Sequence, residues 1–433
     1  MAHTPLSLKP FWWDAAPRPP SQGTEIPERA DVGIIGAGFT GLTAALELAR
    51  AGVSVVVLDA LSPGEGASSR NGGICSGNIK LSFSEMISQF GLDEAKSIFS
   101  EGVAARESLA DLIATESIDC GFKLTGRFTS AIRSADYDHL GREADLMNKY
   151  LALGVEMVPR AEQHRELGTD AFFGGQVRPD IGGLHPGLFV NGLYQRAVEA
   201  GAKVIFPVHV SSVSRQQDSF ILITANGNLQ VGQVIVATNG YSDSSDRWLQ
   251  RRIIPIPSQI IATEPLPAST MTRLMPKGRM LGNTRNLYNY FRPSPDGTRI
   301  LFGGRIGAHT DDPEIKTRHL KRQLIESFPE LKEVNISHSW WGYTGYSFDM
   351  FPHLAQHNGI HYACAYCGSG VVWAPWLGRR VAHRILGRDQ EGSSVFDRPQ
   401  FPTRPLYSGR PWFLPMVIGW YGLLDRFGKG RMS

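Results

Sequence analysis

Two short apolar runs near the N-terminus have the pattern of buried parallel strands. Residues 31–35 lead directly into glycines and an Ala/Leu-rich helical stretch that reaches about Arg50, and residues 54–58 are almost wholly apolar. Strands that are covered on both faces are continuous apolar runs rather than alternating ones. The pattern therefore predicts a β-α-β unit at the start of the chain.

Helical and strand-like patterns alternate further along the chain. The turn sequences Asn226-Gly227 and Ser294-Pro-Asp-Gly297 each separate two strand-like runs, which predicts two β-hairpins. The other expected elements are a Pro-rich, aromatic N-terminal arm over 1–30, helical spacing over 83–118, helix and short strands over 127–160, a helix from His185 to Ala200, a strand at 203–206, hairpin strands at 219–224 with 229–237 and at 288–291 with 299–302, and a strand at 360–365 followed by a helix to Leu386.

Composition narrows the class of protein. The chain has 433 residues, of which 42% are hydrophobic and 20% charged. This length suits two to four domains or one large α/β unit, and the balance excludes a disordered protein. The net charge of +3 is too even to indicate a nucleic-acid partner. Glycine is abundant, at 47 residues, which indicates many sharp turns or close backbone approaches.

Four cysteines in so long a chain do not indicate a disulfide framework. Cys364-Ala-Tyr-Cys367 has no second pair with zinc spacing, so buried thiols are favoured over a redox pair, and no metal site is expected. No signal peptide is expected from the first residues, and the chain is predicted to be cytoplasmic. The apolar tail at 411–424 is shorter than the ~20 residues that cross a bilayer, and its packing on the cofactor domain is favoured over contact with a membrane surface.

A glycine motif follows the first predicted strand. Gly36-Ala-Gly38-Phe-Thr-Gly41 fits G-x-G-x-x-G. The first glycine allows a tight turn, the second lets the backbone approach a pyrophosphate, and the third lets the helix pack closely on the strand. Asp59 lies at the end of the second strand, where a carboxylate accepts hydrogen bonds from a ribose and repels a 2′-phosphate. These features predict NAD or FAD rather than NADP.

The loop after the second strand favours the larger of these dinucleotides. Residues 64–73 (Gly-Glu-Gly-Ala-Ser-Ser-Arg-Asn-Gly-Gly) are dense in N–H and hydroxyl donors. Such a loop suits the ribityl chain and pyrophosphate of FAD, whereas composition alone also allows a flexible surface loop.

Together these motifs resemble the D-amino acid oxidase superfamily of FAD-dependent oxidoreductases, and within it most of all the γ-glutamylputrescine oxidase branch. The resemblance runs from about residue 12 to about residue 427 and includes Ala237-Thr-Asn-Gly-Tyr241, Tyr290-Phe-Arg-Pro-Ser-Pro-Asp-Gly297 and Gly368-Ser-Gly370. It implies an α/β protein with a Rossmann-type FAD-binding domain plus a discontinuous α+β substrate domain with an antiparallel sheet. The FAD-binding domain is expected at 1–85, 156–245 and 345–433, and the substrate domain at 86–155 and 246–344.

The resemblance also implies the cofactor contacts. Some relatives attach FAD covalently through a cysteine near the position of Trp341. Tryptophan cannot form this bond, so FAD is expected to be bound non-covalently here. A helix N-terminus after Gly368 would stabilise negative charge on the flavin. The implied FAD contacts are Gly36, Gly38, Phe39, Thr40, Gly41, Asp59, Ala60, Gly66, Ala67, Ser68, Arg70, Asn71, Gly72, Val210, Ala237, Thr238, Gly240, Gly368, Ser369, Gly370, Val371 and Val372.

Departures from the superfamily pattern indicate an amine substrate. The cations that clamp an α-carboxylate in relatives correspond here to Val372 and to a position near Thr344. Aromatic residues surround those positions, and aromatic rings attract ammonium groups. Arg292 or Arg70 could still supply a cation from another direction, which keeps amino acids open. The candidate substrate pocket comprises Trp341, Tyr343, Tyr366, Val372 and Arg292, and no catalytic side chain is assigned.

The implied activity is FAD-dependent oxidation of a primary or secondary amine of the γ-glutamylputrescine or polyamine type. A hydride passes to flavin N5, the imine hydrolyses, and electrons go to O₂, giving H₂O₂, or to another acceptor. Two alternatives stay open: an oxidase or dehydrogenase of D- or N-methyl amino acids, and a flavin-binding subunit of an oxidoreductase complex. The identity of the amine, the acceptor and the oligomeric state are not determined by the sequence.

Overall fold

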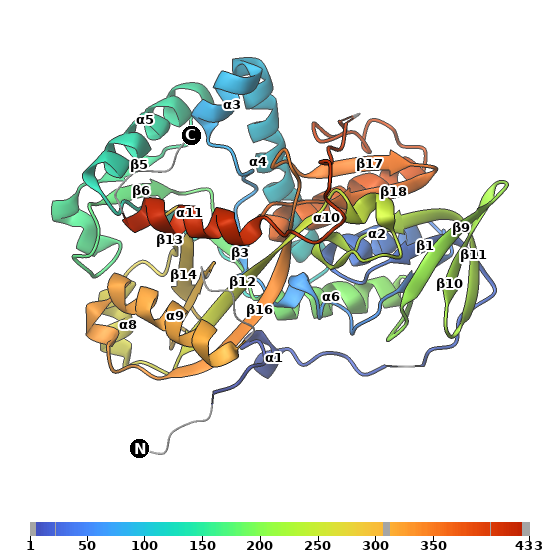
Figure 1. Cartoon of the computed structure of the whole chain (residues 1–433), viewed down its shortest axis with the longest axis horizontal. Helices are drawn as coiled ribbons and strands as arrows, with labels where there is room; N and C mark the ends of the chain where they lie inside the picture. The colour runs from blue at the N-terminus through green and yellow to red at the C-terminus, as the bar shows by residue number, and fades with distance from the viewer. Residues whose placement is uncertain (1–5, 22, 306–311, 399, 427–433) are drawn as a thin grey trace.

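A computed structural model of the chain describes residues 6–21, 23–305, 312–398 and 400–426 (Figure 1). The helices are α1 (Trp12–Ala15), α2 (Phe39–Arg50), α3 (Phe83–Phe90), α4 (Leu92–Thr115), α5 (Ser134–Leu151), α6 (Pro186–Glu199), α7 (Arg247–Gln250), α8 (Ala268–Leu274), α9 (Pro313–Ser327), α10 (Gly370–Ile385) and α11 (Leu414–Arg426). The strands are β1 (Arg29–Ile35), β2 (Val55–Leu58), β3 (Ile74–Cys75), β4 (Arg127–Ser130), β5 (Glu156–Val158), β6 (Gly175–Arg178), β7 (Gly182–Gly183), β8 (Lys203–Ile205), β9 (Val210–Gln216), β10 (Ser219–Thr224), β11 (Gly227–Val236), β12 (Ile254–Thr263), β13 (Met280–Asn283), β14 (Asn289–Pro293), β15 (Ile300–Gly304), β16 (Ile336–Tyr346), β17 (His353–His357) and β18 (Ile360–Cys364).

The first sheet contains the predicted β-α-β unit. Its strand order is β17-β18-β11-β1-β2-β8, and the strands from β18 to β8 are parallel. Side chains of α2, α6 and α10 share one core on one face, while the other face packs against β9, β10 and Phe401. All four residues of β2 are buried, as its continuous apolar sequence predicts.

A second sheet lies beside the first, on the left and towards the centre in Figure 1. Its order is β16-β12-β15-β14-β13-β4-β6-β5, with antiparallel neighbours except for the parallel pair β13 and β4. Helices α8 and α9 bury Met271, Leu320 and Leu324 against it. Both predicted hairpins are present, as β10–β11 and β14–β15. The predicted combination of a Rossmann-type domain and a second, largely antiparallel sheet is confirmed.

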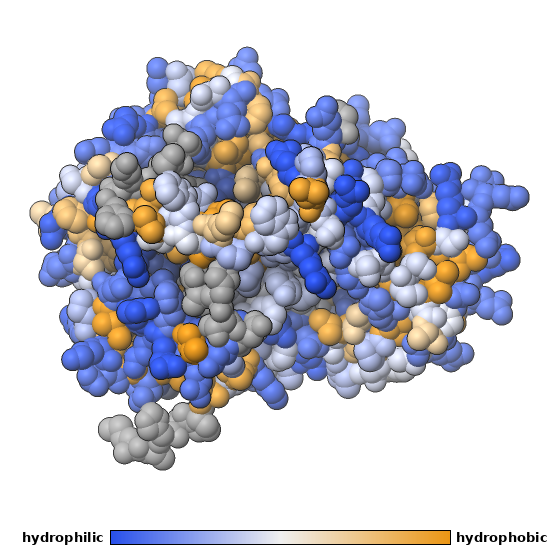
Figure 2. Space-filling model, viewed as in Figure 1, coloured by the Kyte–Doolittle hydropathy of each residue, from blue (hydrophilic) through white to orange (hydrophobic). Residues whose placement is uncertain are grey.

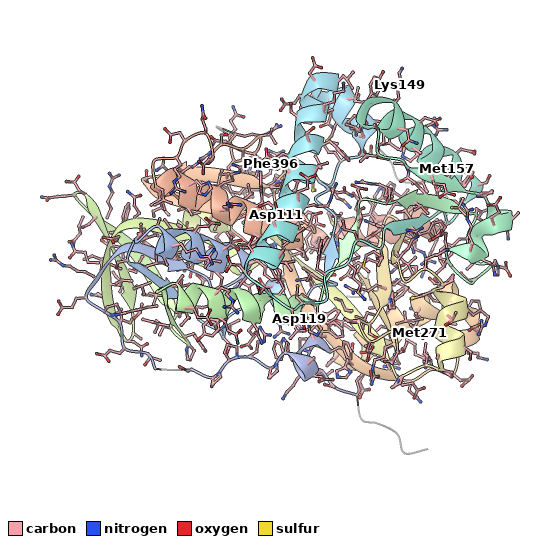
Figure 3. All side chains as sticks on the ribbon, turned by 180° about the vertical axis from the view of Figure 1, so that it is seen from behind. Asp111, Asp119, Lys149, Met157, Met271 and Phe396 are labelled. Carbon is pink, nitrogen blue, oxygen red and sulfur yellow. The ribbon has the colours of Figure 1, made fainter. Side chains whose placement is uncertain are left out.

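The helical region predicted at 83–118 consists of two helices. Gly91 adopts φ +81°, in the left-handed region that favours glycine, and separates α3 from α4. Figure 3, seen from behind, shows α4 running up the back of the molecule with Phe396 beside it. Ala95, Ile98 and Phe396 belong to the same core as α2 and α10. Helix α4 therefore packs against the helices of the first sheet, although the sequence assigned it to the substrate domain.

One expected domain boundary differs from the sheet pairing. The sequence placed residues 156–245 in the FAD-binding domain, but β5 and β6 pair with β4 in the second sheet. The chain returns to the first sheet with α6. We therefore propose that this boundary lies near residue 184.

Both ends of the described chain are anchored to the rest of the molecule. Trp12 is fully buried and begins α1, so it fixes the N-terminal arm. In the tail, Phe413 and Leu414 pack against a cluster that includes Tyr346 and Cys367. The Asp425 carboxylate accepts hydrogen bonds from Asn286 and Leu287, next to the second sheet. Among the described residues, no helix combines the length and apolar character needed to cross a bilayer.

Candidate cofactor-binding and active site

A long pocket runs from the carboxyl ends of β1 and β2 to β16 and the start of α10. Its empty space is about 1550 Å³ with the open mouth included. The residues of the sequence-based prediction that line it are Gly36, Gly38, Phe39, Thr40, Asp59, Ala60, Gly66, Ala67, Ser68, Asn71, Val210, Ala237, Thr238, Tyr343, Tyr366, Gly368, Gly370 and Val371.

The glycine motif forms a cradle with no room for side chains. Gly36 has φ +106°, and a Cβ on Gly38 would lie 2.9 Å from the Oγ of Ser68. A Cβ on Gly41 would lie 1.9 Å from the carbonyl oxygen of Gly36, so only glycine lets α2 pack this closely. Helix α2 therefore directs its N-terminus, with its unpaired N–H groups and positive dipole end, at the pocket.

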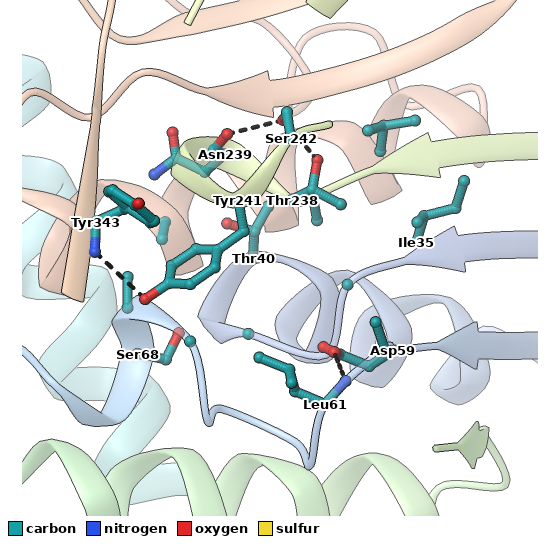
Figure 4. Close-up of a pocket in the computed structure, with 18 of the residues that line it drawn as sticks. Ile35, Thr40, Asp59, Leu61, Ser68, Thr238, Asn239, Tyr241, Ser242 and Tyr343 are labelled. Carbon is teal, nitrogen blue, oxygen red and sulfur yellow. Dashed lines mark hydrogen bonds between the residues drawn. The ribbon is translucent and has the colours of Figure 1, made fainter. Parts of the chain in front are cut away.

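Asp59 lies at the end of the pocket next to β2. Its carboxylate accepts hydrogen bonds from the N–H of Ala37 at 2.6 Å and of Leu61 at 2.8 Å (Figure 4). Burial raises the pKa of Asp59 to about 6. Each carboxylate oxygen has a second lone pair, which can accept a hydrogen bond from a hydroxyl group. The neighbouring wall includes Val208 and Val210, an apolar surface suited to a nucleobase.

The donor-rich loop at 64–73 is held in place by tryptophans. The indole N–H of Trp12 donates to the carbonyl of Asn71 at 2.8 Å, and that of Trp340 donates to the carbonyl of Arg70 at 2.9 Å. Trp13 donates to the Ser69 hydroxyl at 2.9 Å. The loop is thus fixed from two sides, by the N-terminal arm and by β16 of the second sheet.

Aromatic side chains and the start of α10 form the other end of the pocket. Tyr241 and Tyr343 meet edge to face with their ring centroids 5.6 Å apart, and the Tyr343 N–H donates to the Tyr241 hydroxyl (Figure 4). Trp341 meets Tyr343 edge to face at 5.1 Å. Gly368, at φ +103°, turns the chain into α10, whose first residues line the pocket.

Some predicted residues lie behind the lining instead of on it. Gly41 and Gly240 pack against backbone, and Gly72 lies against the ring of Tyr290. Val372 is fully buried, and Trp341 is 42% exposed at the rim. The predicted residues absent from the lining are Gly41, Arg70, Gly72, Gly240, Ser369, Val372, Trp341 and Arg292.

Arg292 donates hydrogen bonds to the backbone around the donor-rich loop. Its guanidinium donates to the carbonyls of Leu184 at 2.8 Å and of Gly73 at 3.3 Å. Burial lowers its pKa to about 10. The side chain therefore holds the end of the donor-rich loop, and the structure does not place it in a substrate pocket.

Several lining residues were missed from the sequence. Asn239, Tyr241 and Ser242 come after Ala237 and Thr238 in the segment that follows β11, and Thr344 follows Tyr343. Asn239 has φ +45° and accepts a hydrogen bond from the N–H of Ala365. The Ala-Thr-Asn-Gly sequence at the strand end was the available signal, because Asn and Gly are the residues that most readily adopt this conformation.

Cys364, Cys367 and His185 have structural roles. Both thiols are buried, which confirms the sequence-based prediction, and burial raises the pKa of Cys367 to about 11. His185 caps α6, its Nδ1 accepting from the N–H of Leu188, and burial lowers its pKa to about 4. Within the described part of the chain, no group of three metal-ligating side chains comes together.

Comparison with known proteins identifies the family. The sequence profile of the DAO family, described as FAD dependent oxidoreductase, matches residues 31–384. The chain belongs to this family. This FAD-dependent oxidoreductase is 31% identical to a probable oxidoreductase OrdL of Haemophilus influenzae. The alignment covers 92% of this chain and 93% of that protein. It is 29% identical to a gamma-glutamylputrescine oxidoreductase of Escherichia coli, in an alignment that covers 92% of this chain and 93% of that protein.

The fold of the family is also found among solved structures. Glycine oxidase of Geobacillus kaustophilus superimposes with a TM-score of 0.73 and 20% identity, covering 88% of this chain and 99% of that protein. The pocket fits the cofactor of the family: a glycine cradle for a pyrophosphate, a carboxylate for a ribose, an apolar wall for adenine, and a fixed donor-rich loop. FAD is thus the cofactor of the enzyme.

Proposed function

We propose that this flavoenzyme oxidises a primary or secondary amine of the γ-glutamylputrescine or polyamine type at the carbon next to nitrogen. The observation that carries the proposal is the wall of the pocket at its aromatic end. Tyr241 and Tyr343 line it, and among the described lining residues there is no Lys or Arg. An α-carboxylate would find no Lys or Arg there to bind it, whereas an amine without a carboxylate needs no such cation.

FAD supplies the hydride acceptor, flavin N5, and the chain positions it and the amine. Gly36, Gly38 and Asp59 would hold the dinucleotide, and the N-terminus of α10 would face the flavin. Burial raises the pKa of Tyr241 and of Tyr366, so both hydroxyls stay protonated at neutral pH. They act as neutral hydrogen-bonding groups rather than bases, so the amine has to reach the pocket already neutral. The imine is then hydrolysed by water.

Anaerobic bleaching of the bound flavin tests this proposal. Purified enzyme is mixed without O₂ with diamines, polyamines and their γ-glutamyl derivatives, N-methyl amino acids, and D-amino acids. We expect rapid loss of the visible flavin absorption with the diamines, the polyamines and their γ-glutamyl derivatives, but not with the N-methyl amino acids or the D-amino acids. Peroxide measured per turnover in air then decides between O₂ and another acceptor, and acid precipitation should release FAD that is bound non-covalently. A flavin that no member of the panel bleaches would instead favour a flavin-binding subunit.

One contact favours a second candidate, the oxidation of amino acids with a relocated carboxylate anchor. The guanidinium of Arg305, at the end of β15, lies 4.8 Å from the centroid of the Tyr346 ring, and the Tyr346 hydroxyl lies close to Gly368. If only α-amino acids bleach the flavin and Arg305→Met raises their KM, this candidate replaces the amine proposal.

A further inference from the structure

Helix α11 has both buried and exposed apolar side chains. Ile418 and Leu424 are buried, and Gly422 lies against Leu287. The side chains of Met416, Trp420 and Leu423 are exposed by 69%, 55% and 51%. At 100° per residue these three fall on one stripe, roughly opposite to Ile418 and about 70° away from Leu424. The helix is therefore attached by some of its apolar side chains and leaves others in solvent.

Two further exposed apolar side chains precede the helix in sequence. Trp412 is 63% exposed and Leu406 is 89% exposed, and residues 411–424 contain no charged side chain. Over α11, Figure 2 shows pale and orange residues, with strongly hydrophilic ones near the end that leads back toward α10. Large apolar side chains exposed together on one helix are the kind of surface that interaction sites use.

The charge around the stripe is basic. Within residues 403–426 the basic side chains are Arg404, Arg410 and Arg426, and the acidic one, Asp425, is bound to backbone and side-chain N–H groups of the neighbouring loop. Leu406 also borders an open pocket that contains Arg247, Arg251 and Arg252. A surface of this composition complements an anionic one.

We propose that α11, with Trp412 and Leu406, docks this enzyme onto an anionic lipid bilayer. A helix of 13 residues is about 20 Å long and cannot span a membrane, but it can lie in the interface with one face among the acyl chains. Tryptophan is enriched at that depth, because its ring is apolar and its N–H is polar. The arginines bind the anionic headgroups.

A bilayer fits this stripe better than a second copy of the chain does. A standard protein interface takes about 20–30 residues from each partner, whereas the stripe consists of a handful of side chains around one helix. Insertion into a membrane has no such threshold, because each buried side chain and each arginine adds to the binding.

Vesicle sedimentation of the holoenzyme tests the proposal. We expect the protein to sediment with vesicles of phosphatidylcholine and phosphatidylglycerol at low salt, to sediment weakly with pure phosphatidylcholine, and to be released as salt is raised. The variant M416Q/W420Q/L423Q should lose at least tenfold in vesicle affinity. Arg404→Gln and Arg410→Gln should each weaken binding to the anionic vesicles about fivefold. The control Leu124→Gln, at an exposed apolar residue outside the stripe, should bind like the wild type.

Two results would overturn the proposal. One is a wild-type enzyme that does not sediment with the anionic vesicles. The other is a triple variant that binds them as well as the wild type. Light scattering distinguishes the alternative occupant, because a wild-type dimer that the triple variant converts to a monomer, without vesicle binding, would assign the stripe to a second copy. Flavin content and activity in solution should be equal in all variants, since the stripe lies outside the cofactor pocket.

Discussion

Carboxylates of the same type have different roles in this enzyme because their surroundings differ. Asp59 is half-buried at the end of β2, and its two N–H partners only partly offset the cost of desolvating its charge, so its pKa is raised to about 6. Asp425 accepts several hydrogen bonds at the surface and fixes α11 to the second sheet. Of the two, Asp59 is the carboxylate whose charge should respond to a bound ribose.

The raised pKa of Asp59 predicts that FAD binding depends on pH. Its contribution to the stability of the apo-protein is full below the unfolded pKa of about 3.9 and is lost as the pH rises through about 6. Ribose hydroxyls donate to the ionised form. The Kd for FAD should therefore rise by up to about tenfold per unit as the pH falls below about 6, as fluorescence titration would measure.

Asp59→Asn should remove this pH dependence and weaken FAD binding roughly 10- to 100-fold, because a hydrogen bond to a charged group contributes about 1.5–3 kcal/mol. Asp425→Asn is the matched control and should keep the wild-type pH profile. An Asp59→Asn enzyme with the wild-type profile would show that Asp59 does not contact the ribose.

At the scale of elements, the short helix α1 contributes to a site far from it in sequence. Trp12 is fully buried and Trp13 partly so, and both donate to the loop that follows β2. The ring of Trp13 also lies under the guanidinium of Arg70 at 4.8 Å. This N-terminal arm therefore holds the loop that follows β2 in place. The sequence of the arm does not indicate this contact.

Trp12→Phe should weaken FAD binding about fivefold, because it removes the donor to the Asn71 carbonyl and one such hydrogen bond contributes about 1 kcal/mol. The matched control is Trp376→Phe, which removes an indole donor to Glu101 on α4 instead. Both variants should lower the Tm of the apo-protein, but only Trp12→Phe should change the Kd for FAD. Equal Kd values in the two variants would contradict the positioning role.

At the scale of the whole molecule, the pocket is assembled from segments of both sheets. Gly36 and Asp59 belong to the first sheet and its turns, Tyr343 belongs to the second, and Gly368 begins the turn into α10. FAD should therefore protect distant segments of the chain together. In hydrogen exchange we expect slower exchange on FAD addition over 36–41, 59–72, 237–246, 343–344 and 366–374, with little change in α5. Protection confined to 36–72 would mean that the far end of the pocket does not bind the cofactor.

Much of the fold is encoded locally and was therefore predicted. The β-α-β unit, the two hairpins and the final strand and helix follow from apolar periodicity and turn residues within about 20 neighbours. The glycine spacing at Gly36, Gly38 and Gly41 is equally recognisable from the local sequence, since at each position a side chain would collide with neighbouring atoms. The boundary that we propose near residue 184 rests on the pairing of β5 and β6 in the second sheet, and these strands are too short for the sequence to reveal their partners.

The sequence by itself determined the family, the cofactor and the residues of the dinucleotide turn, because these depend on neighbours along the chain. Only the tertiary structure decided that Arg292 supports the loop, that Trp12 and Trp340 hold that loop from two sides, and that apolar side chains of α11 stay exposed. Each of those roles depends on which distant group lies within hydrogen-bonding or packing distance. No periodicity or motif records that information, because it arises only when the two sheets meet.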